Sequence, residues 1–499
     1  MSDPLPSSMG VPNEMLLGKL DYSLPADAKA YSVKIQPSNI SQVQVAGIKL
    51  GISTSTAILD GLQFTSQNII FDIPCGQTPS TFLDNRFSTL NFRMNIAVTN
   101  AGTTSTASFG YLRSHANAFF DRMYLVSGNG STLEDIAEYG LVNDTLINLQ
   151  QSNSVRRGTA LQYGFNPDNL SQGVPLALFN ATGANASRAI LATDNETHSF
   201  SVPILSSVIG CTANSFLNIG RTSKLQLVFQ TAPILPFSLF QLAQAAGSVG
   251  ATFTVTLSDF SLGLEYIDVG MQALQMIDQT LVNNKAYIHG VTYRTAAAIL
   301  NATAGSTSIL AGIRASSVKS IFTRFYENNS ATGTINSPNN KYDSKCPLLT
   351  GISYNIGGLR FPQNPINPLM NPSQAFRELQ MAIGSFNSSQ FTSAIIPSQY
   401  CKLSTGGTDQ GVNVGSNQAY EWSLGTSVVA QSLFIFGEDL EIVAKRGLLS
   451  GLNCTSAPVF VDLTIASPGP TNTHTVYTIA MVDSILIHDV VTGDIHTRI

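Results

Sequence analysis

The stretch LNIGRTSKLQLVFQTAP, residues 217–233, has a counterpart in LNCTSAPVFVDLTIASP, residues 452–468. Each begins with Leu-Asn, passes through Thr-Ser to a strand of alternating apolar and polar residues, and ends in a proline-containing turn. Further along, SDFSLGLEYIDVG (258–270) parallels VDSILIHDVVTG (482–493). A repeat at about half the chain length predicts two similar β domains joined near residue 270. Chance similarity between two generic β segments is the alternative.

Alternation of apolar and polar residues recurs through most of the chain. It is clear in LNFRMNIAV (90–98), KLQLVF (224–229), ATFTVTLS (251–258) and VFVDLTI (459–465). Such a period of two indicates strands with one face buried. Turn-forming clusters such as NAGTTST (100–106) and SPGPTNT (467–473) separate them. Many short strands and few helices predict an all-β chain of sandwiches or barrels, not a parallel βαβ sheet.

The composition indicates extensive contact with other chains. Only 11% of the 499 residues are charged, against roughly 25% in ordinary soluble domains. A surface with so little charge is poorly protected against association, so we expect other subunits to cover much of it. The net charge of −5 and the lack of a long Lys/Arg run argue against a nucleic-acid-binding surface. They remain compatible with a container whose DNA is neutralised by other molecules.

Targeting and redox signals are weak. Cysteines 75, 211, 346, 401 and 454 are isolated, which favours free thiols over a zinc or redox site. The start of the chain lacks the pattern of a signal peptide, and no stretch of about 18 apolar residues predicts a membrane span. Asn129 and Asn143 begin glycosylation sequons, but a chain rich in Asn, Ser and Thr contains such sequons by chance.

Three segments show helical patterns. In SGNGSTLEDIAEYGLVND (127–144), Ser131 and Glu134 fit a capping box, and an apolar stripe follows at Leu133, Ile136, Ala137, Gly140 and Leu141. The carboxylates of Glu134, Asp135 and Glu138 therefore have a structural explanation. LPFSLFQLAQAAG (235–247) is the second predicted helix. The third is NPSQAFRELQMAIG (371–384), with Asn371 as cap, Pro372 in the first turn and Gly384 as stop.

No pattern of catalytic, cofactor-binding or metal-binding residues emerges, so we predict a protein that is not an enzyme. Phosphate-binding loops, zinc-protease motifs and nucleophile elbows are absent from the sequence. His488 and His496 could share a face, but two histidines alone make a weak metal site. The glycine-rich STGGTDQG (404–411) is interpreted as a loop, and YEWSL (420–424), with the only Trp, as core or interface.

One strand, IRASSVKSIFTRFYENN (313–329), carries Arg314, Lys319 and Arg324. The simpler interpretation is a strand with a basic outer face. The more specific hypothesis is a contact with an acidic neighbouring subunit. Nucleic-acid binding would require more cations and an aromatic platform.

The chain as a whole resembles the double jelly-roll major capsid proteins of tailless icosahedral double-stranded DNA viruses, and most of all those of Polinton-like viruses and virophages. In its first half, FDIPCGQTPSTFLDNRFSTLNFRM (71–94) is followed by a Gly turn and a segment of the type LE-x-I-x-x-Y, here Leu133, Glu134, Ile136 and Tyr139. In its second half, RASSVKSIFTRF (314–325) is followed by a proline-rich segment. That segment matches at Pro362, Pro365, Asn371, Pro372, Phe376, Glu378, Leu379 and Gly384.

The resemblance implies an architecture and a role. We expect an N-terminal arm at residues 1–30 that ties neighbours together, a first eight-stranded jelly roll at 31–270 and a second at 271–499, with a few short helices in inter-strand loops. Three chains would form a pseudo-hexagonal capsomer of an icosahedral shell around a double-stranded DNA genome. Its partners would be copies of itself and minor capsid or penton proteins, in the virion. Loops 101–106, 181–187 and 404–416 are candidates for exposed tips.

Other functions remain open at this stage. The nearest is a minor capsid, vertex or receptor-binding β-sandwich protein. A secreted lectin-like adhesin is suggested by the sequons and Thr-rich strands. A β-sandwich hydrolase would be expected to use Glu134 or Asp135.

Overall fold

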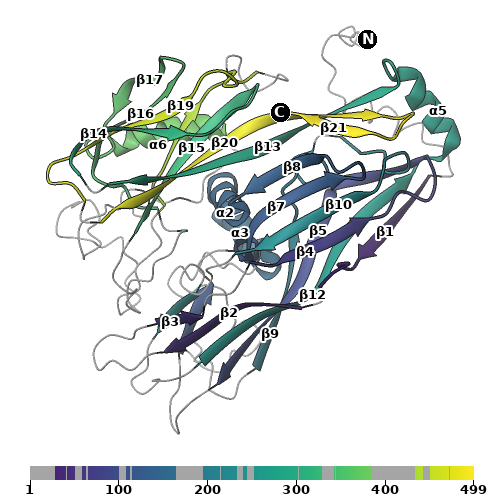
Figure 1. Cartoon of the computed structure of the whole chain (residues 1–499), viewed down its shortest axis with the longest axis horizontal. Helices are drawn as coiled ribbons and strands as arrows, with labels where there is room; N and C mark the ends of the chain where they lie inside the picture. The colour runs from purple at the N-terminus through teal and green to yellow at the C-terminus, as the bar shows by residue number, and fades with distance from the viewer. Residues whose placement is uncertain are drawn as a thin grey trace.

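The computed structural model describes residues 28–499 with gaps. The description leaves out 41, 51–58, 63–65, 100–107, 113–114, 164–194, 214, 233–239, 244–251, 302, 329–341, 343, 385–394, 396–399, 401–432, 442–449 and 471. Outside the described residues lie the predicted exposed loops, the glycine-rich segment 404–411 and the segment 420–424. What is described is dominated by antiparallel sheets in two groups, one from each half of the chain (Figure 1).

The first group is a sandwich of two sheets. The larger sheet has the order β3-β2-β12-β5-β9, with β1 also paired to β12. Its strands are β1 (Lys29–Ile35), β2 (Gln42–Leu50), β3 (Leu59–Leu62), β5 (Thr81–Thr99), β9 (Asn195–Pro203) and β12 (Thr252–Asp268). The facing sheet has the order β4-β10-β7-β8. Its strands are β4 (Asn68–Ile73), β7 (Phe120–Ser127), β8 (Thr132–Ala137) and β10 (Leu225–Thr231).

The second group repeats this arrangement. One sheet has the order β13-β20-β15-β18, with β21 also paired to β20, and the other has the order β14-β19-β16-β17. The strands are β13 (Lys285–Leu300), β14 (Gly305–Ala311), β15 (Val318–Glu327), β16 (Leu349–Ile356), β17 (Leu359–Ile366), β18 (Ile435–Asp439), β19 (Val459–Ile465), β20 (His474–Asp489) and β21 (Ile495–Arg498).

The two groups share one topology. The eight strands β13 to β20, taken in chain order, hold the same sheet positions as eight places in the first sandwich. Those places are, in the same order, β1/β2, β4, β5, β7, β8, β9, β10 and β12. Two sheets with this order of strands make a jelly roll, in which non-consecutive strands pair across Greek-key connections. Each half of the chain is therefore a jelly-roll sandwich of the predicted kind.

The sequence repeat has a direct structural counterpart. In the first sandwich Leu83 forms an isolated antiparallel bridge with Leu217, and in the second Val318 forms one with Leu452. Leu217 and Leu452 are the first residues of the two segments that the sequence pattern aligns. The strands that follow, β10 and β19, hold the same place in their sheets. Common topology, not chance, accounts for the similarity.

Each sandwich buries the apolar face that alternation predicts. In β19 the residues Val459, Val461, Leu463 and Ile465 are buried and those between them are half-buried. In the first sandwich Phe92 of β5 lies at the centre of an aromatic cluster with Phe119, Phe120, Phe200 and Phe260, at centroid distances of 5.4–6.1 Å. Burial of these faces is the main source of stability for each sandwich.

Smaller elements connect the strands. They are β6 (Ser108–Leu112), which pairs with β11 (Phe240–Ala243), the 3₁₀ helix η1 (Ala116–Phe119), and the helices α2 (Tyr139–Gln150), α3 (Asn153–Tyr163), α5 (Gly270–Thr280) and α6 (Pro372–Ile383). Helices α2 and α3 lie between β8 and β9, and α6 lies between β17 and β18. Helix α5 begins at Gly270, where the sequence repeat predicts that the two halves are joined.

One of the three helix predictions is confirmed. Helix α6 begins at Pro372 and ends at Gly384, whose φ of 84° is the left-handed conformation that glycine adopts readily. Asn371 is the cap residue, although its side chain makes no capping hydrogen bond. The helix predicted at 235–247 is wrong where it is described, since Phe240–Ala243 is strand β11.

The capping box at Ser131 and Glu134 is also wrong. Residues Thr132–Ala137 form strand β8, which pairs with β7, and the helix begins only at Tyr139. Leu133 and Ile136 are buried, as expected, but as strand residues. The apolar spacing in this short segment fits a helix as well as a strand, so only pairing with β7 decides between them.

A matched pair of leucines on neighbouring strands tests the core. Leu463→Ala on β19, where the side chain is 1% exposed, is expected to lower the free energy of unfolding by about 2–5 kcal/mol, because it leaves a cavity. Leu310→Ala on β14, where the side chain is 57% exposed, is expected to change it by less than about 0.5 kcal/mol. Urea unfolding followed by circular dichroism measures both. Equal losses would contradict the assigned faces.

Candidate functional site: the seam between the two sandwiches

The two sandwiches meet along a seam formed by one edge of each. Strand β13 of the second sandwich is long and runs, together with β21, alongside β8 of the first (Figure 1). Backbone atoms join across this seam: Gly290 of β13 forms a bridge with Ala213, and the N–H of Val291 donates to the carbonyl of Thr212 at 3.2 Å. The edge of β13 is thus paired with backbone of the first sandwich at this point.

Side chains of the second sandwich also bond the backbone of β8. Thr295 Oγ1 donates to the carbonyl of Ala137 at 3.0 Å, and Thr497 Oγ1 donates to the carbonyl of Leu133 at 2.6 Å. Gly290 has no room for a side chain, because a Cβ there would lie 2.6 Å from the carbonyl oxygen of Ser207. The seam is a close contact of backbone on backbone.

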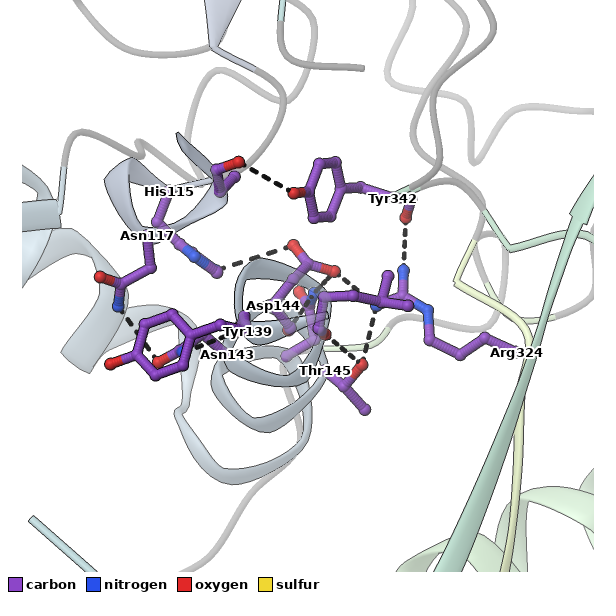
Figure 2. A network of polar contacts seen from close by, with 11 residues as sticks. His115, Asn117, Tyr139, Asn143, Asp144, Thr145, Arg324 and Tyr342 are labelled. Carbon is purple, nitrogen blue, oxygen red and sulfur yellow. Dashed lines mark hydrogen bonds and ion pairs between the residues drawn. The ribbon is translucent and has the colours of Figure 1, made fainter. Parts of the chain in front are cut away.

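At one end of the seam, Arg324 and Asp144 form a buried ion pair (Figure 2). Arg324 projects from β15 of the second sandwich, and Asp144 lies on α2 of the first. Arg324 Nη1 lies 2.7 Å from Asp144 Oδ2 and 2.9 Å from Thr145 Oγ1, and Nη2 donates to the carbonyl of Tyr342. Arg324 is 1% exposed and Asp144 2%. A buried pair of this kind depends on such additional hydrogen bonds.

Further polar groups surround the pair. His115 Nε2 lies 3.7 Å from Asp144 Oδ1, and Tyr342 closes the network by donating its hydroxyl to the carbonyl of Ala118 at 3.2 Å (Figure 2). Tyr342 belongs to the second half of the chain and Ala118 to the first. The network therefore crosses the seam twice, once through Arg324 and once through Tyr342.

Helix α2 is shaped to fit between the sandwiches. It starts after Glu138, whose φ of 53° turns the chain sharply from β8 into the helix. At Gly140 a Cβ would lie 2.8 Å from Ala118 Cα and 2.8 Å from the Tyr342 hydroxyl, so only glycine lets the elements approach so closely. Nearly every residue of the helix is buried. Several of its polar side chains also bond within the helix, as Asn143 Nδ2 does to the carbonyl of Tyr139 at 2.8 Å.

Glu134 forms a second polar cluster at the seam. Its carboxylate accepts hydrogen bonds from Ser206 Oγ, from the Ser207 N–H at 3.0 Å and from Ser207 Oγ at 2.9 Å. Ser207 Oγ also lies 3.3 Å from Ser484 Oγ of β20. Burial raises the pKa of Glu134, and the hydrogen bonds from the serines and from Thr292 of β13 oppose that rise.

The three acidic residues singled out by the sequence thus have structural positions. Glu134 is buried in the seam, Asp135 forms a two-point ion pair with Arg122 of β7, and Glu138 makes the turn into α2. Glu134 does not cap a helix as predicted, and β13 and the segment around Ser207 cover it. Among the residues the structure describes, none of them belongs to a group of His, Cys, Asp and Glu that could hold a metal ion.

The prediction of a basic outer face on residues 313–329 is also corrected, although Arg314 is exposed as expected. Arg324 is buried, and Lys319 lies 3.2–3.3 Å from Asp483 and Glu441. Arg324 does contact an acidic residue, as hypothesised. That residue, however, belongs to the other half of the same chain and not to a neighbouring subunit. Asp144 stands 180 residues away, and no sequence signal links the two.

The histidines and cysteines considered in the sequence analysis do not form a site among the described residues. His488 is buried near the carbonyl of Arg221, whereas His496 is exposed, so they do not share a face. Among the described residues, cysteines 75, 211 and 454 are free thiols, and Cys401 lies outside the described residues. Within the described ranges no group of His, Cys, Asp and Glu could hold a metal ion, and no helix is long and apolar enough to span a membrane.

Comparison with solved structures identifies the class of fold. A chain in the cryo-EM structure of the Sputnik virophage superposes with a TM-score of 0.50 and 12% identity, over 93% of this chain and 89% of that one. The mavirus major capsid protein gives 0.48 and 10% over 100% and 97%, and the PBCV-1 capsid model 0.49 and 10% over 93% and 95%. No family model and no curated protein matches the sequence. With the topology above, the Sputnik likeness shows a double jelly-roll fold.

Removing one partner of the central ion pair tests its role. Arg324→Met is expected to lower the free energy of unfolding by about 3–5 kcal/mol, because it leaves Asp144 buried without its cation. The double variant Arg324→Met with Asp144→Leu is expected to recover most of that loss. Urea unfolding of the four members of the cycle measures both effects. Additive losses in the double variant would show that the two residues do not act as a pair.

Because Glu134 is buried, we expect its contribution to the stability of the chain to depend on pH. Since its pKa in the folded chain lies above its ordinary value of 4.5, its contribution to stability is fully present below pH 4.5 and falls as the pH rises through the folded-state pKa. Relative to Glu134→Gln, the unmodified chain is therefore expected to lose stability as the pH rises above 4.5. Thermal unfolding across that range measures the difference. Parallel pH profiles, or a difference abolished by salt, would contradict a buried titrating group.

Proposed function

We propose that the chain is a structural major capsid protein, located in the virion, and that three copies form a pseudo-hexagonal capsomer of an icosahedral shell around a double-stranded DNA genome. The observation that carries this proposal is the pair of jelly-roll sandwiches locked by a buried polar seam. A shell subunit must hold a fixed shape, because errors in angle accumulate over many identical contacts. The likeness in fold to a chain of the Sputnik virophage supports the same role.

The surface of the chain suits assembly. Large apolar side chains remain exposed on several elements: Phe87, Val155, Met271, Met276, Val282, Tyr287, Ile299, Leu310, Leu359, Met370 and Val491. Together with the low content of charge, they give each copy many weakly adhesive sites. Weak contacts repeated over a shell add up through multivalency while still allowing correction during assembly.

A structural role also fits the acidic residues. Glu134 joins two sandwiches and Asp135 neutralises Arg122, so neither is placed to act on a substrate. We therefore propose that the chain is not an enzyme. With a net charge of −5 it would leave the neutralisation of packaged DNA to other molecules.

The proposal includes a division of the chain. Residues 1–30 are proposed as an arm that ties neighbouring copies together, 31–270 as the first jelly roll and 271–499 as the second. Minor capsid or penton proteins would be further partners. The adhesin alternative is weakened by Asn143, whose sequon lies in α2, 6% exposed and bonded to Asn117, where no glycan could be attached in the folded chain.

Solution mass and imaging test the proposed function. Size-exclusion chromatography with light scattering is expected to give the mass of three chains, and negative-stain electron microscopy to show particles of hexagonal outline. The fold leaves many apolar side chains uncovered in the single chain, which is the physical reason to expect association. A chain that stays monomeric at every concentration tested, with no hexagonal particles, would overturn the proposal.

A further inference from the structure

The outer face of the sheet β4-β10-β7-β8 carries a polar pocket of about 270 Å³. In this sheet Met123, Leu125 and Phe229 are buried in the core, so the residues that alternate with them point outward. The pocket is lined by polar side chains from all four strands: Asn68, Arg122, Tyr124, Thr132, Asp135 and Gln230. Its volume lies just below the usual range of ligand pockets, which suits a small ligand.

The strand register brings these side chains together. Asn68 of β4, Gln230 of β10 and Arg122 of β7 stand directly opposite one another and form one row across three strands. In the next row Tyr124 of β7 stands directly opposite Asp135 of β8. Opposite residues of a sheet lie on the same face, about 5 Å apart. The polar groups of the two rows therefore converge on the pocket.

Arg122 forms a fixed wall of the pocket. Its Nε lies 2.7 Å from Asp135 Oδ1 and its Nη2 lies 2.5 Å from Asp135 Oδ2. Its guanidinium carbon lies 5.4 Å from the centroid of the Tyr124 ring. The two-point ion pair holds the guanidinium in one orientation and neutralises its charge. The lining therefore carries no net charge, which disfavours a phosphate or another anion as the ligand.

The other polar side chains of the lining are open to a ligand. Within the part of the chain that the structure describes, the side chains of four of them make no hydrogen bond: Asn68, Tyr124, Thr132 and Gln230. The two amides each present donors and an acceptor, and the two hydroxyls can act as either. A ligand that satisfies them has to donate and accept hydrogen bonds at several closely spaced atoms.

One row of the same sheet pairs its polar side chains, and the row at the pocket does not. Four residues before Gln230, on the same strand and face, Gln226 donates through Nε2 to Asp72 Oδ1 at 3.1 Å. Gln226 stands directly opposite Asp72, as Gln230 stands directly opposite Asn68. The side chains of Gln230 and Asn68 do not bond each other, so both are available to a ligand.

We propose that this pocket binds the ring of a neutral sugar. The neighbouring hydroxyl groups of a sugar both donate and accept hydrogen bonds, so they match the amides of Asn68 and Gln230. The C–H groups on one face of the sugar pack on the ring of Tyr124. The lack of net charge in the lining matches a neutral sugar and not an acidic one. This goes beyond the proposed function, since a shell subunit needs no such ligand.

Sugar binding by the full chain tests the proposal. Protein produced in bacteria, which carries no glycans of its own, is mixed in turn with glucose, galactose, mannose, fucose and N-acetylglucosamine. Saturation-transfer NMR is expected to show transfer from the protein to at least one of these sugars. The dissociation constant is expected in the millimolar range, because a single ring buries little surface. An array of oligosaccharides that end in the same sugar shows whether the ring is also bound at the end of a glycan, and either result supports a sugar site.

Two glutamines of β10 provide a variant and its matched control. Gln230→Ala removes a polar group of the lining and is expected to weaken sugar binding about tenfold. Gln226→Ala makes the same change outside the pocket and is expected to leave sugar binding unchanged. Asn68→Ala, at an exposed position, is a second variant with the same expectation as Gln230→Ala. None of the three side chains is fully buried, so unchanged melting temperatures are expected for all three variants.

Three outcomes would overturn this inference. One is the absence of transfer to any of the five sugars. Another is equal binding by Gln230→Ala, Asn68→Ala and the unmodified chain, which would place the sugar elsewhere. The third is binding confined to sialic acid, added as an acidic comparison. Light scattering of the same samples reports assembly separately, so a monomeric chain that still binds sugar would overturn the proposed function and leave this inference standing.

Discussion

The buried ion pair of Arg324 and Asp144 constrains the architecture more than any other single contact. Both sandwiches contribute buried apolar residues, but the two charges of this pair come from different sandwiches, and neither would be paired without the other. A charge removed from water requires a partner and hydrogen bonds in fixed directions, which Thr145, Tyr342 and their neighbours provide. The pair is satisfied in one arrangement of the two sandwiches, so it selects that arrangement over others of similar apolar contact.

The seam as a whole follows the same logic. Glu134 with its serines, the backbone pairing at Gly290 and the threonines of β13 and β21 are directional contacts, unlike apolar packing, which tolerates sliding. Because the two sandwiches are fixed relative to each other, their outer surfaces keep constant angles to one another.

Much of the fold could be predicted from local patterns, and the failures have a common cause. The alternation of apolar and polar residues predicts strands β10, β12 and β19. The cap, proline and glycine signals at Asn371, Pro372 and Gly384 predict helix α6. Both kinds of signal depend only on neighbours in sequence. The segment around Glu134 was assigned to a helix because Leu133 and Ile136 suit either period. Pairing with β7 and cover by the second sandwich make it a strand, and neither is visible locally.

The sequence by itself determined strands with clear alternation such as β10, β12 and β19, the repeat of one topology and the resemblance to double jelly-roll proteins, since alternation and turn residues act over short distances. Only the tertiary structure decided what the charged residues do. Arg324 in an alternating strand suggests an outward-facing cation, and Glu134 suggests a helix cap. Each is instead buried against a partner far along the chain, because the contact of two sandwiches brings together residues that no local pattern relates.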